Sequence, residues 1–201
     1  STLFPYTTLF RSASHVIDVF KAPNGQHIHK VKLLDGVITV GDEVELVIDK
    51  DRRKRIECNH SSVHMLQYSL QQLVSSTIKQ AGSYVDQDKL RFDFTYAGKM
   101  NDDKLLEVEN YINDMIKKEI IVSTEVMPID KARQMGAMAL FGEKYGDIVR
   151  VVKIGKSMEL CGGTHVANTK EIGKIALSSC ESKGSNVYRI EGVTGDRIES
   201  T

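Results

Sequence analysis

The chain has 201 residues, of which 41% are hydrophobic and 27% are charged, and its 27 basic and 27 acidic residues cancel. This length allows one sizeable core or two small domains, and the neutral balance confines any contact with RNA to a local patch. No apolar run is long enough to span a bilayer, and three cysteines in a chain of this size favour a reducing cytoplasm over a disulfide scaffold.

The first dozen residues, STLFPYTTLFRS, are apolar and rich in hydroxyl groups. They lack the order of a secretory signal, which places basic residues before a longer apolar segment and a cleavage site. The stretch resembles translated adapter sequence. We therefore expect residues 1–14 to be an artefactual or disordered stretch outside the fold, and the chain to be a fragment of a longer protein.

Three short runs rich in Val, Ile and Leu follow, at residues 15–20, 27–34 and 43–48, and turn-forming residues separate them. Short strands at this spacing predict a small β-barrel-like domain. The basic run DKDRRKR, residues 49–55, ends this domain as a linker. It is either a solvated segment or a contact for the RNA backbone.

Residues 56–201 mix helical and strand patterns without regular alternation. Apolar residues at helical spacing predict a helix from near His60 to a stop at Gly82, and a second helix over residues 101–119 capped by Asn101 or Asp102. A short helix is expected near residues 130–135. Strands are expected at residues 90–96, 120–126, 148–154, 173–180 and 187–193. The fold class is therefore α+β, with a largely antiparallel sheet packed with helices around a zinc site.

Two pairs of residues predict that site. His60 and His64 stand four apart, and on a helix both imidazoles would lie on one face. Cys161 and His165 repeat the spacing, and one thiolate with three imidazoles suits tetrahedral zinc. Ser61 stands where a HExxH protease needs Glu, which argues against that chemistry.

The second pair is the more informative, because Gly162 and Gly163 between its members would let the chain turn sharply. Cys58 and Cys180 have no such context and are interpreted as small hydrophobic residues. Four protein ligands are typical of a structural zinc, whereas a catalytic zinc usually keeps three and a water. Spacing alone leaves the purpose of the site open.

No ATP site is expected in the chain. Gly155, Lys156 and Ser157 imitate the end of a phosphate-binding loop, but Arg150 stands where that loop requires its first glycine.

Several strings then carry a resemblance to a family. HSSVH, KQAGSYV, LRFDF, GAMALFGEKYG, MELCGGTH and YRIEGVTG occur in the order seen in alanyl-tRNA synthetases, in the editing domain and the small β-domain before it. The resemblance covers residues 15–198. GAMALFGEKYG, residues 136–146, and Thr164 before His165 separate the chain from the related threonyl editing domain.

The resemblance implies a zinc-dependent esterase that hydrolyses mischarged seryl- or glycyl-tRNA(Ala), with tRNA as partner and no membrane. Serine is alanine plus a hydroxyl, and glycine simply fits an alanine pocket, so a second site must remove these errors. The metal ligands it implies are His60, His64, Cys161 and His165.

Further roles follow from the same resemblance. Cys161 and Gln80 are the candidate catalytic residues, although Ala81 stands where the family often has Lys beside that Gln. The candidate substrate-binding residues are Gln80, Ser61, Ser62, Gly162 and Gly163. No Glu or Asp is adjacent to the ligands, so the attacking water would be activated by the metal or by a tRNA ribose hydroxyl.

Three alternatives remain open. One is a free-standing editing protein that deacylates tRNA in trans. Another is a non-catalytic, zinc-stabilised RNA-binding module. The third is a chance set of ligand residues that holds no metal. The preference for serine or glycine and the oligomeric state are not readable from these residues.

Overall fold

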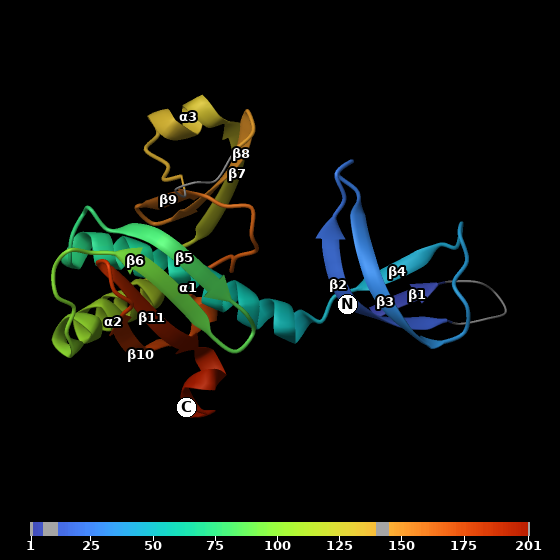
Figure 1. Ribbon diagram of the computed structural model, residues 1–201, viewed down its shortest axis with the longest axis horizontal. Helices are drawn as coiled ribbons and strands as arrows, with labels where there is room; N and C mark the ends of the chain where they lie inside the picture. Colours follow the sequence, from blue (N-terminus) through green and yellow to red (C-terminus); the bar gives the residue numbers. More distant parts are fainter. Residues whose placement is uncertain (1, 6–11, 140–144, 201) are drawn as a thin grey trace. The chain divides into compact units, whose positions relative to one another are not determined.

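The structure is a computed structural model that describes residues 2–5, 12–139 and 145–200 (Figure 1). It divides into two compact units, Ser1–Arg53 and Lys54–Thr201.

The smaller unit is an open antiparallel sheet with the strand order β3-β2-β1-β4. Its described strands do not close into the predicted barrel, because β3 and β4 remain as the two edges. The stretch expected to lie outside the fold contains β1, which pairs with both β2 and β4. The strands are β1 (Thr2–Pro5), β2 (Ala13–Lys21), β3 (His27–Asp35) and β4 (Val44–Val47).

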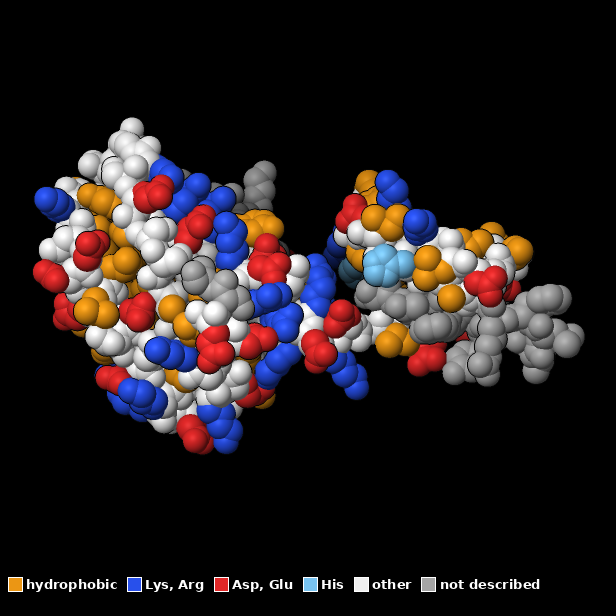
Figure 2. Space-filling view, turned by 90° about the horizontal axis from the view of Figure 1, so that it is seen from below, with side chains coloured by type: hydrophobic (Ala, Val, Ile, Leu, Met, Phe, Trp, Pro, Cys, Tyr) orange, Lys and Arg blue, Asp and Glu red, His pale blue; other side chains and the backbone are white. Residues whose placement is uncertain are grey.

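Apolar side chains of this unit are exposed to solvent. Within residues 12–53 only Ser12 and Ser14 are buried, while Ile17, Phe20 and Leu34 are each at least half exposed. Figure 2 shows apolar side chains spread over the surface of this unit, at the right of the view. The unit thus has strand patterning without a buried apolar core in the described residues.

The helix that carries the first ligand pair begins earlier than the sequence predicted. Helix α1 (Lys50–Leu73) takes in almost all of the expected basic linker, because the Asp49 carboxylate accepts the Arg52 backbone N–H and caps the helix. In its second turn Lys54 bonds to Glu171, and the Arg55 guanidinium lies 3.0 Å from Asp196. Part of the charge run therefore forms ion pairs within the larger unit.

The predicted stop of this helix at Gly82 is wrong. The helix ends at Leu73, and the backbone N–H groups of Val74 and Ser75 both bond to the Leu70 carbonyl. Hydroxyl groups compete with helical hydrogen bonding, and here the Ser75 and Thr77 hydroxyls bond to each other at 2.8 Å. The chain then forms strand β5 (Lys79–Val85), so that Gln80 lies in a strand.

The larger unit is built on an antiparallel sheet in the order β10-β11-β6-β5. Its core is made by alternating residues of the strands, such as Phe92 and Phe94, against Leu66 of α1 and Ile112 of α2, all fully buried. Both helices pass behind this sheet in Figure 1. The bounds are β5 (Lys79–Val85), β6 (Leu90–Thr95), α2 (Asp102–Lys117), β10 (Ile175–Ser182) and β11 (Val187–Thr194).

The predicted second helix, its Asn101 cap and the α+β class with antiparallel sheets are confirmed. The Asn101 side chain accepts the Lys104 backbone N–H at 3.1 Å.

A second, three-stranded sheet has the order β7-β8-β9 and its own small core with Ala132 of α3 and Leu160 of β9. Strand β9 was not predicted, since it is only four residues long. Gly155 has φ 62° in the tight turn that joins β8 to β9, a conformation that favours glycine. The elements are β7 (Val122–Pro128), α3 (Ile129–Gln134), β8 (Ile148–Ile154), β9 (Ser157–Leu160) and the 3₁₀ helices η1 (Thr169–Ile172) and η2 (Gly195–Ser200).

Of the helices in the described residues, none is both long and apolar enough to cross a membrane.

A bidentate ion pair joins β6 to β11. The Arg189 guanidinium donates to both Asp93 carboxylate oxygens at 2.8 Å, and the Asp93 side chain is only 14% exposed. These hydrogen bonds hold the pKa of Asp93 below its usual value, and burial opposes them without cancelling them. The pair therefore favours the folded state while Asp93 is ionised.

We predict that Asp93→Asn lowers the free energy of unfolding at pH 7 by about 1–2 kcal/mol. The deficit relative to wild type should shrink below about pH 4, because the folded-state pKa of Asp93 lies below its unfolded value. Urea unfolding at several pH values measures this. Asp114→Asn, which removes an exposed pair with Lys117, is the matched control; an equal loss in both variants would contradict the prediction.

Candidate metal centre

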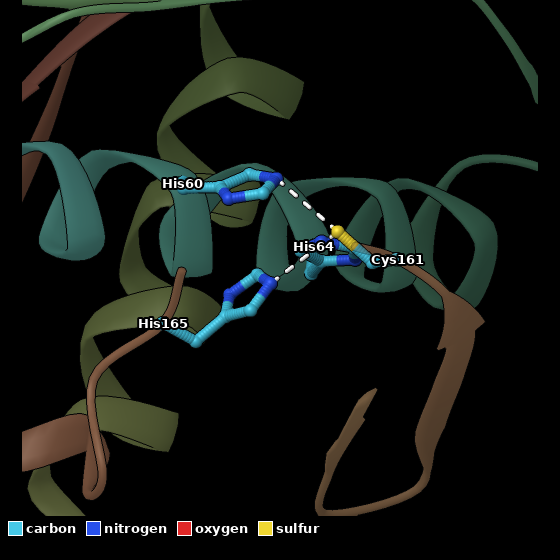
Figure 3. A group of neighbouring side chains, drawn as sticks. All are labelled: His60, His64, Cys161 and His165. Carbon is cyan, nitrogen blue, oxygen red and sulfur yellow. Dashed lines mark hydrogen bonds between the residues drawn. The ribbon is translucent and has the colours of Figure 1, made fainter. Parts of the chain in front are cut away.

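Four side chains from two distant segments of the chain meet at one point of the larger unit. His60 and His64 stand one turn apart on α1, and Cys161 and His165 come from the loop after β9 (Figure 3). Their ligand atoms all lie within 4.8 Å of one another. The arrangement could hold a metal ion, as the two sequence pairs predicted.

The loop of Cys161 and His165 is fixed at both ends by burial. Leu160 before it is 2% exposed in the core of the three-stranded sheet, and Val166 after it is 2% exposed in the main core. Arg150 of β8 reinforces the loop: its guanidinium donates to the carbonyls of Cys161, at 3.1 Å, and of Gly163. Sequence reasoning gave Arg150 no role in the site.

The two glycines of the loop have different surroundings. Neither has a positive φ, so the site does not use the left-handed freedom that the sequence suggested. A Cβ on Gly163 would lie 2.6 Å from Nδ1 of His60, whereas a Cβ on Gly162 would meet nothing within 4 Å. Gly163 is required because it leaves room for a ligand ring.

Two of the imidazoles are oriented by hydrogen bonds on their outer nitrogens. Nδ1 of His60 lies 3.1 Å from the Thr164 carbonyl, and Nδ1 of His165 lies 3.2 Å from the Ser61 hydroxyl. Their Nε2 atoms face Cys161 Sγ at 3.5 and 3.4 Å. Such outer contacts set the tautomer that directs Nε2 to a metal.

The third imidazole has a carboxylate behind it. Nδ1 of His64 lies 2.6 Å from Glu159 Oε2, and both side chains are less than 10% exposed. Ser157 holds the other carboxylate oxygen at 3.2 Å. Sequence reasoning found no acid near the ligands, but Glu159 stands two residues before Cys161 and so projects to the same side of the extended chain.

The charges of the site follow from these contacts. Burial lowers the pKa of His64, but the Glu159 carboxylate and Cys161 outweigh it and raise the pKa. Burial raises the pKa of Cys161, but hydrogen bonds from the three imidazoles lower it far below its usual value. The site thus favours a thiolate beside a protonated imidazole, and a bound cation would replace that proton.

This donor set fits a metal ion on two observations. One thiolate and three imidazoles are ligands of the borderline and soft first-row ions, and all three rings have an outer Nδ1 partner. Bound there, the ion would be held by His60, His64, Cys161 and His165.

The candidate substrate residues are placed less uniformly. The Ser61 hydroxyl is occupied by His165 and by the Val166 backbone N–H at 3.2 Å, so it supports a ligand. Ser62 is buried, and its hydroxyl has no hydrogen-bond partner among the described residues. Gln80 is half-buried on β5, and its amide donates to the Ser83 hydroxyl at 3.1 Å.

The string at residues 136–146 lies partly outside the described residues, which omit 140–144. Its described part includes Met138, which forms a bridge with Glu159 and so runs beside β9.

Comparisons with known proteins agree with the motif resemblance. A family model for the threonyl and alanyl tRNA synthetase second additional domain matches residues 149–191. The chain is 46% identical to the alanine–tRNA ligase of Listeria monocytogenes serotype 4b over 183 residues, which is 90% of this chain and 21% of that protein. Identity is 45% for Halalkalibacterium halodurans and 47% for Geobacillus thermodenitrificans, with the same coverage. The resemblance to alanyl-tRNA synthetases is confirmed, and the chain spans about a fifth of these relatives.

We predict that Gly163→Ala weakens binding of a divalent ion by at least about tenfold, because its Cβ would displace the His60 ring. Titration with Co²⁺, followed by its thiolate absorption band, measures the affinity. Gly162→Ala is the matched control and should bind like wild type. Equal affinities of the two variants would contradict the steric argument.

Glu159→Gln should lower the affinity for Co²⁺ by about 10- to 100-fold, because the neutral amide holds the His64 ring less strongly. Glu125→Gln, at an exposed position of β7, removes one negative charge outside the ligand cluster and should leave the affinity for Co²⁺ unchanged. Wild-type affinity in Glu159→Gln would show that the carboxylate does not support the ligand.

Proposed function

We propose that this chain, which is similar over nine tenths of its length to a segment of alanine–tRNA ligases, is an editing region that hydrolyses mischarged tRNA. Its substrate would be tRNA(Ala) that carries serine or glycine, and the bond cleaved is the ester between the amino acid and the terminal ribose. The observation that carries the proposal is the meeting of His60, His64, Cys161 and His165, the ligands that the resemblance implies, at one point.

We further propose Zn²⁺ as the ion, because zinc prefers four ligands and binds both thiolate and imidazole groups. Zinc supplies a Lewis acid, able to polarise the ester carbonyl or to lower the pKa of water. Three neutral imidazoles and one thiolate would leave about one positive charge on the site.

The residues around the centre would orient the ligands, bind substrate and set the charge of the site. The Glu159 carboxylate lies on the Nδ1 side of His64, so it orients that ring and is not a free general base. In the proposal a water or a ribose hydroxyl of the tRNA attacks the ester. Gln80 would bind substrate, and Cys161, as the one anionic ligand, would tune the charge of the site.

The test is deacylation of Ser-, Gly- and Ala-tRNA by the purified chain, with its zinc content measured alongside. The editing proposal requires loss of Ser- or Gly-tRNA at a rate that a chelator abolishes, with Ala-tRNA spared. A folded, zinc-containing protein that binds RNA without hydrolysis would favour the non-catalytic module. Activity in the isolated chain is also what a free-standing editing protein would show.

We predict that Cys161→Ala reduces the deacylation of Ser-tRNA by at least about 10- to 100-fold, the loss typical of a disturbed metal site. Cys180→Ala is the matched control, because this partly buried thiol lies outside the cluster. Zinc content and circular dichroism verify occupancy and folding. An unchanged rate in Cys161→Ala would remove the centre from the chemistry.

A further inference from the structure

A pocket of about 340 Å³ lies beside the metal centre in the larger unit. We call it the glutamine pocket, because Gln67 and Gln71 of α1 and Gln80 of β5 line it, together with Ser76, Ile78, Lys79, Met138 and Ala139. No ligand of the metal centre is among these residues.

Two connections place the pocket next to the centre. Gln67 comes three residues after His64 on α1, so the two side chains are neighbours on one helix face. In addition, the backbone of Met138, which also lines the pocket, pairs beside Glu159, and the Glu159 carboxylate bonds to His64. A group bound in the pocket would therefore be close to a reaction at the metal.

The amide of Gln67 lacks the hydrogen bonds that a buried amide normally has. Gln67 is 5% exposed, its Oε1 has no partner in the described part of the chain, and its Nε2 reaches only the weakly accepting Met138 sulfur at 3.7 Å. In contrast, the Gln71 amide donates to the Ile78 carbonyl at 2.9 Å, and the Gln80 amide donates to Ser83. Gln67 is thus the pocket glutamine with unused hydrogen-bonding capacity.

The Gln67 amide offers an acceptor without a partner, Oε1, beside a donor that reaches only the Met138 sulfur, and this pattern matches the N6 amino group and N7 of adenine. Ile78, Met138 and Ala139 supply apolar surface for the faces of a flat base, and Lys79 supplies a positive charge that suits a nucleotide phosphate. Every tRNA carries its amino acid on the ribose of a terminal adenosine. The adenine base and the ester therefore belong to the same nucleotide, and a site for the base must lie close to a site for the ester.

We propose that the glutamine pocket binds the terminal adenine of tRNA and that Gln67 reads its N6–N7 edge. The inference rests on the proposed function for its substrate class. Gln67 acts here as a specificity-determining residue, and the metal centre acts on the ester of the same nucleotide.

The test compares two uncharged acceptor-stem RNAs that end in adenosine or in inosine, which replaces the N6 amino group with a carbonyl. Wild-type protein should bind the adenosine RNA roughly 5- to 150-fold more tightly, the discrimination of one bidentate contact. Fluorescence anisotropy measures both affinities without any hydrolysis. Equal binding of the two RNAs by wild type, or no binding of either, would overturn the proposal.

Variants then assign the preference to one side chain. Gln67→Leu should abolish the preference for adenosine. The variant should fold, because the buried amide that it removes has only a weak hydrogen bond to the Met138 sulfur. Gln72→Leu makes the same change at an exposed position of α1 and should keep the preference. A preference that survives in Gln67→Leu would overturn the assignment.

The outcomes separate this inference from the proposed function. Chelator-sensitive deacylation without a preference for adenosine would contradict the proposed adenine site and leave the editing proposal intact. A preference for adenosine in a protein that deacylates none of the tRNAs would support the adenine site and contradict the editing proposal.

Discussion

The cluster of three imidazoles and one thiolate is a crowded arrangement, in which no two donor atoms are more than 4.8 Å apart. Such groups stay together only if their surroundings hold them there. Burial of Leu160 and Val166 fixes the loop, and the capped helix α1 fixes the two imidazoles opposite. The site that we assign to the metal therefore depends on the packing of helix α1 and of the loop after β9 in the larger unit.

The contacts on the outer side of the ligand rings explain why particular residues stand next to the ligands in the sequence. Glu159 and Cys161 stand two residues apart and project to the same side of the chain. The Glu159 carboxylate therefore orients the His64 ring, and the Cys161 thiol faces the same ring. Ser61 is buried and bonds to His165, which gives this hydroxyl a role in supporting a ligand. Gly163 completes the set, because any larger residue would collide with His60.

The two proposals assign different parts of one substrate to different parts of the unit. The metal centre would act on the ester, where serine and glycine differ from alanine by only a hydroxyl or a methyl group. The glutamine pocket would bind the base, which all these substrates share. Helix α1 positions both, since His64 and Gln67 lie on the same face one turn apart.

Local sequence patterns were sufficient to predict the helices and strands whose buried residues recur at a regular spacing. The second helix with its Asn101 cap, the strand through Phe92 and Phe94, and the one-turn spacing of His60 and His64 were readable from the sequence. In contrast, Gly82 was misread as a helix stop, because the pairing of β5 with β6 outweighs local propensity. The early start of α1 was missed because a charge run alone does not reveal the Asp49 cap.

The sequence by itself therefore determined the four ligand types and their spacing, together with the family that the chain resembles. Only the tertiary structure decided that residues 101 positions apart meet, as Nε2 of His60 and Sγ of Cys161 do. It also decided the supporting places of Glu159 and Arg150, and it left Oε1 of Gln67 without a partner among the described residues. The physical reason is that spacing acts within one element, whereas burial and hydrogen bonding between distant segments depend on how the whole unit packs.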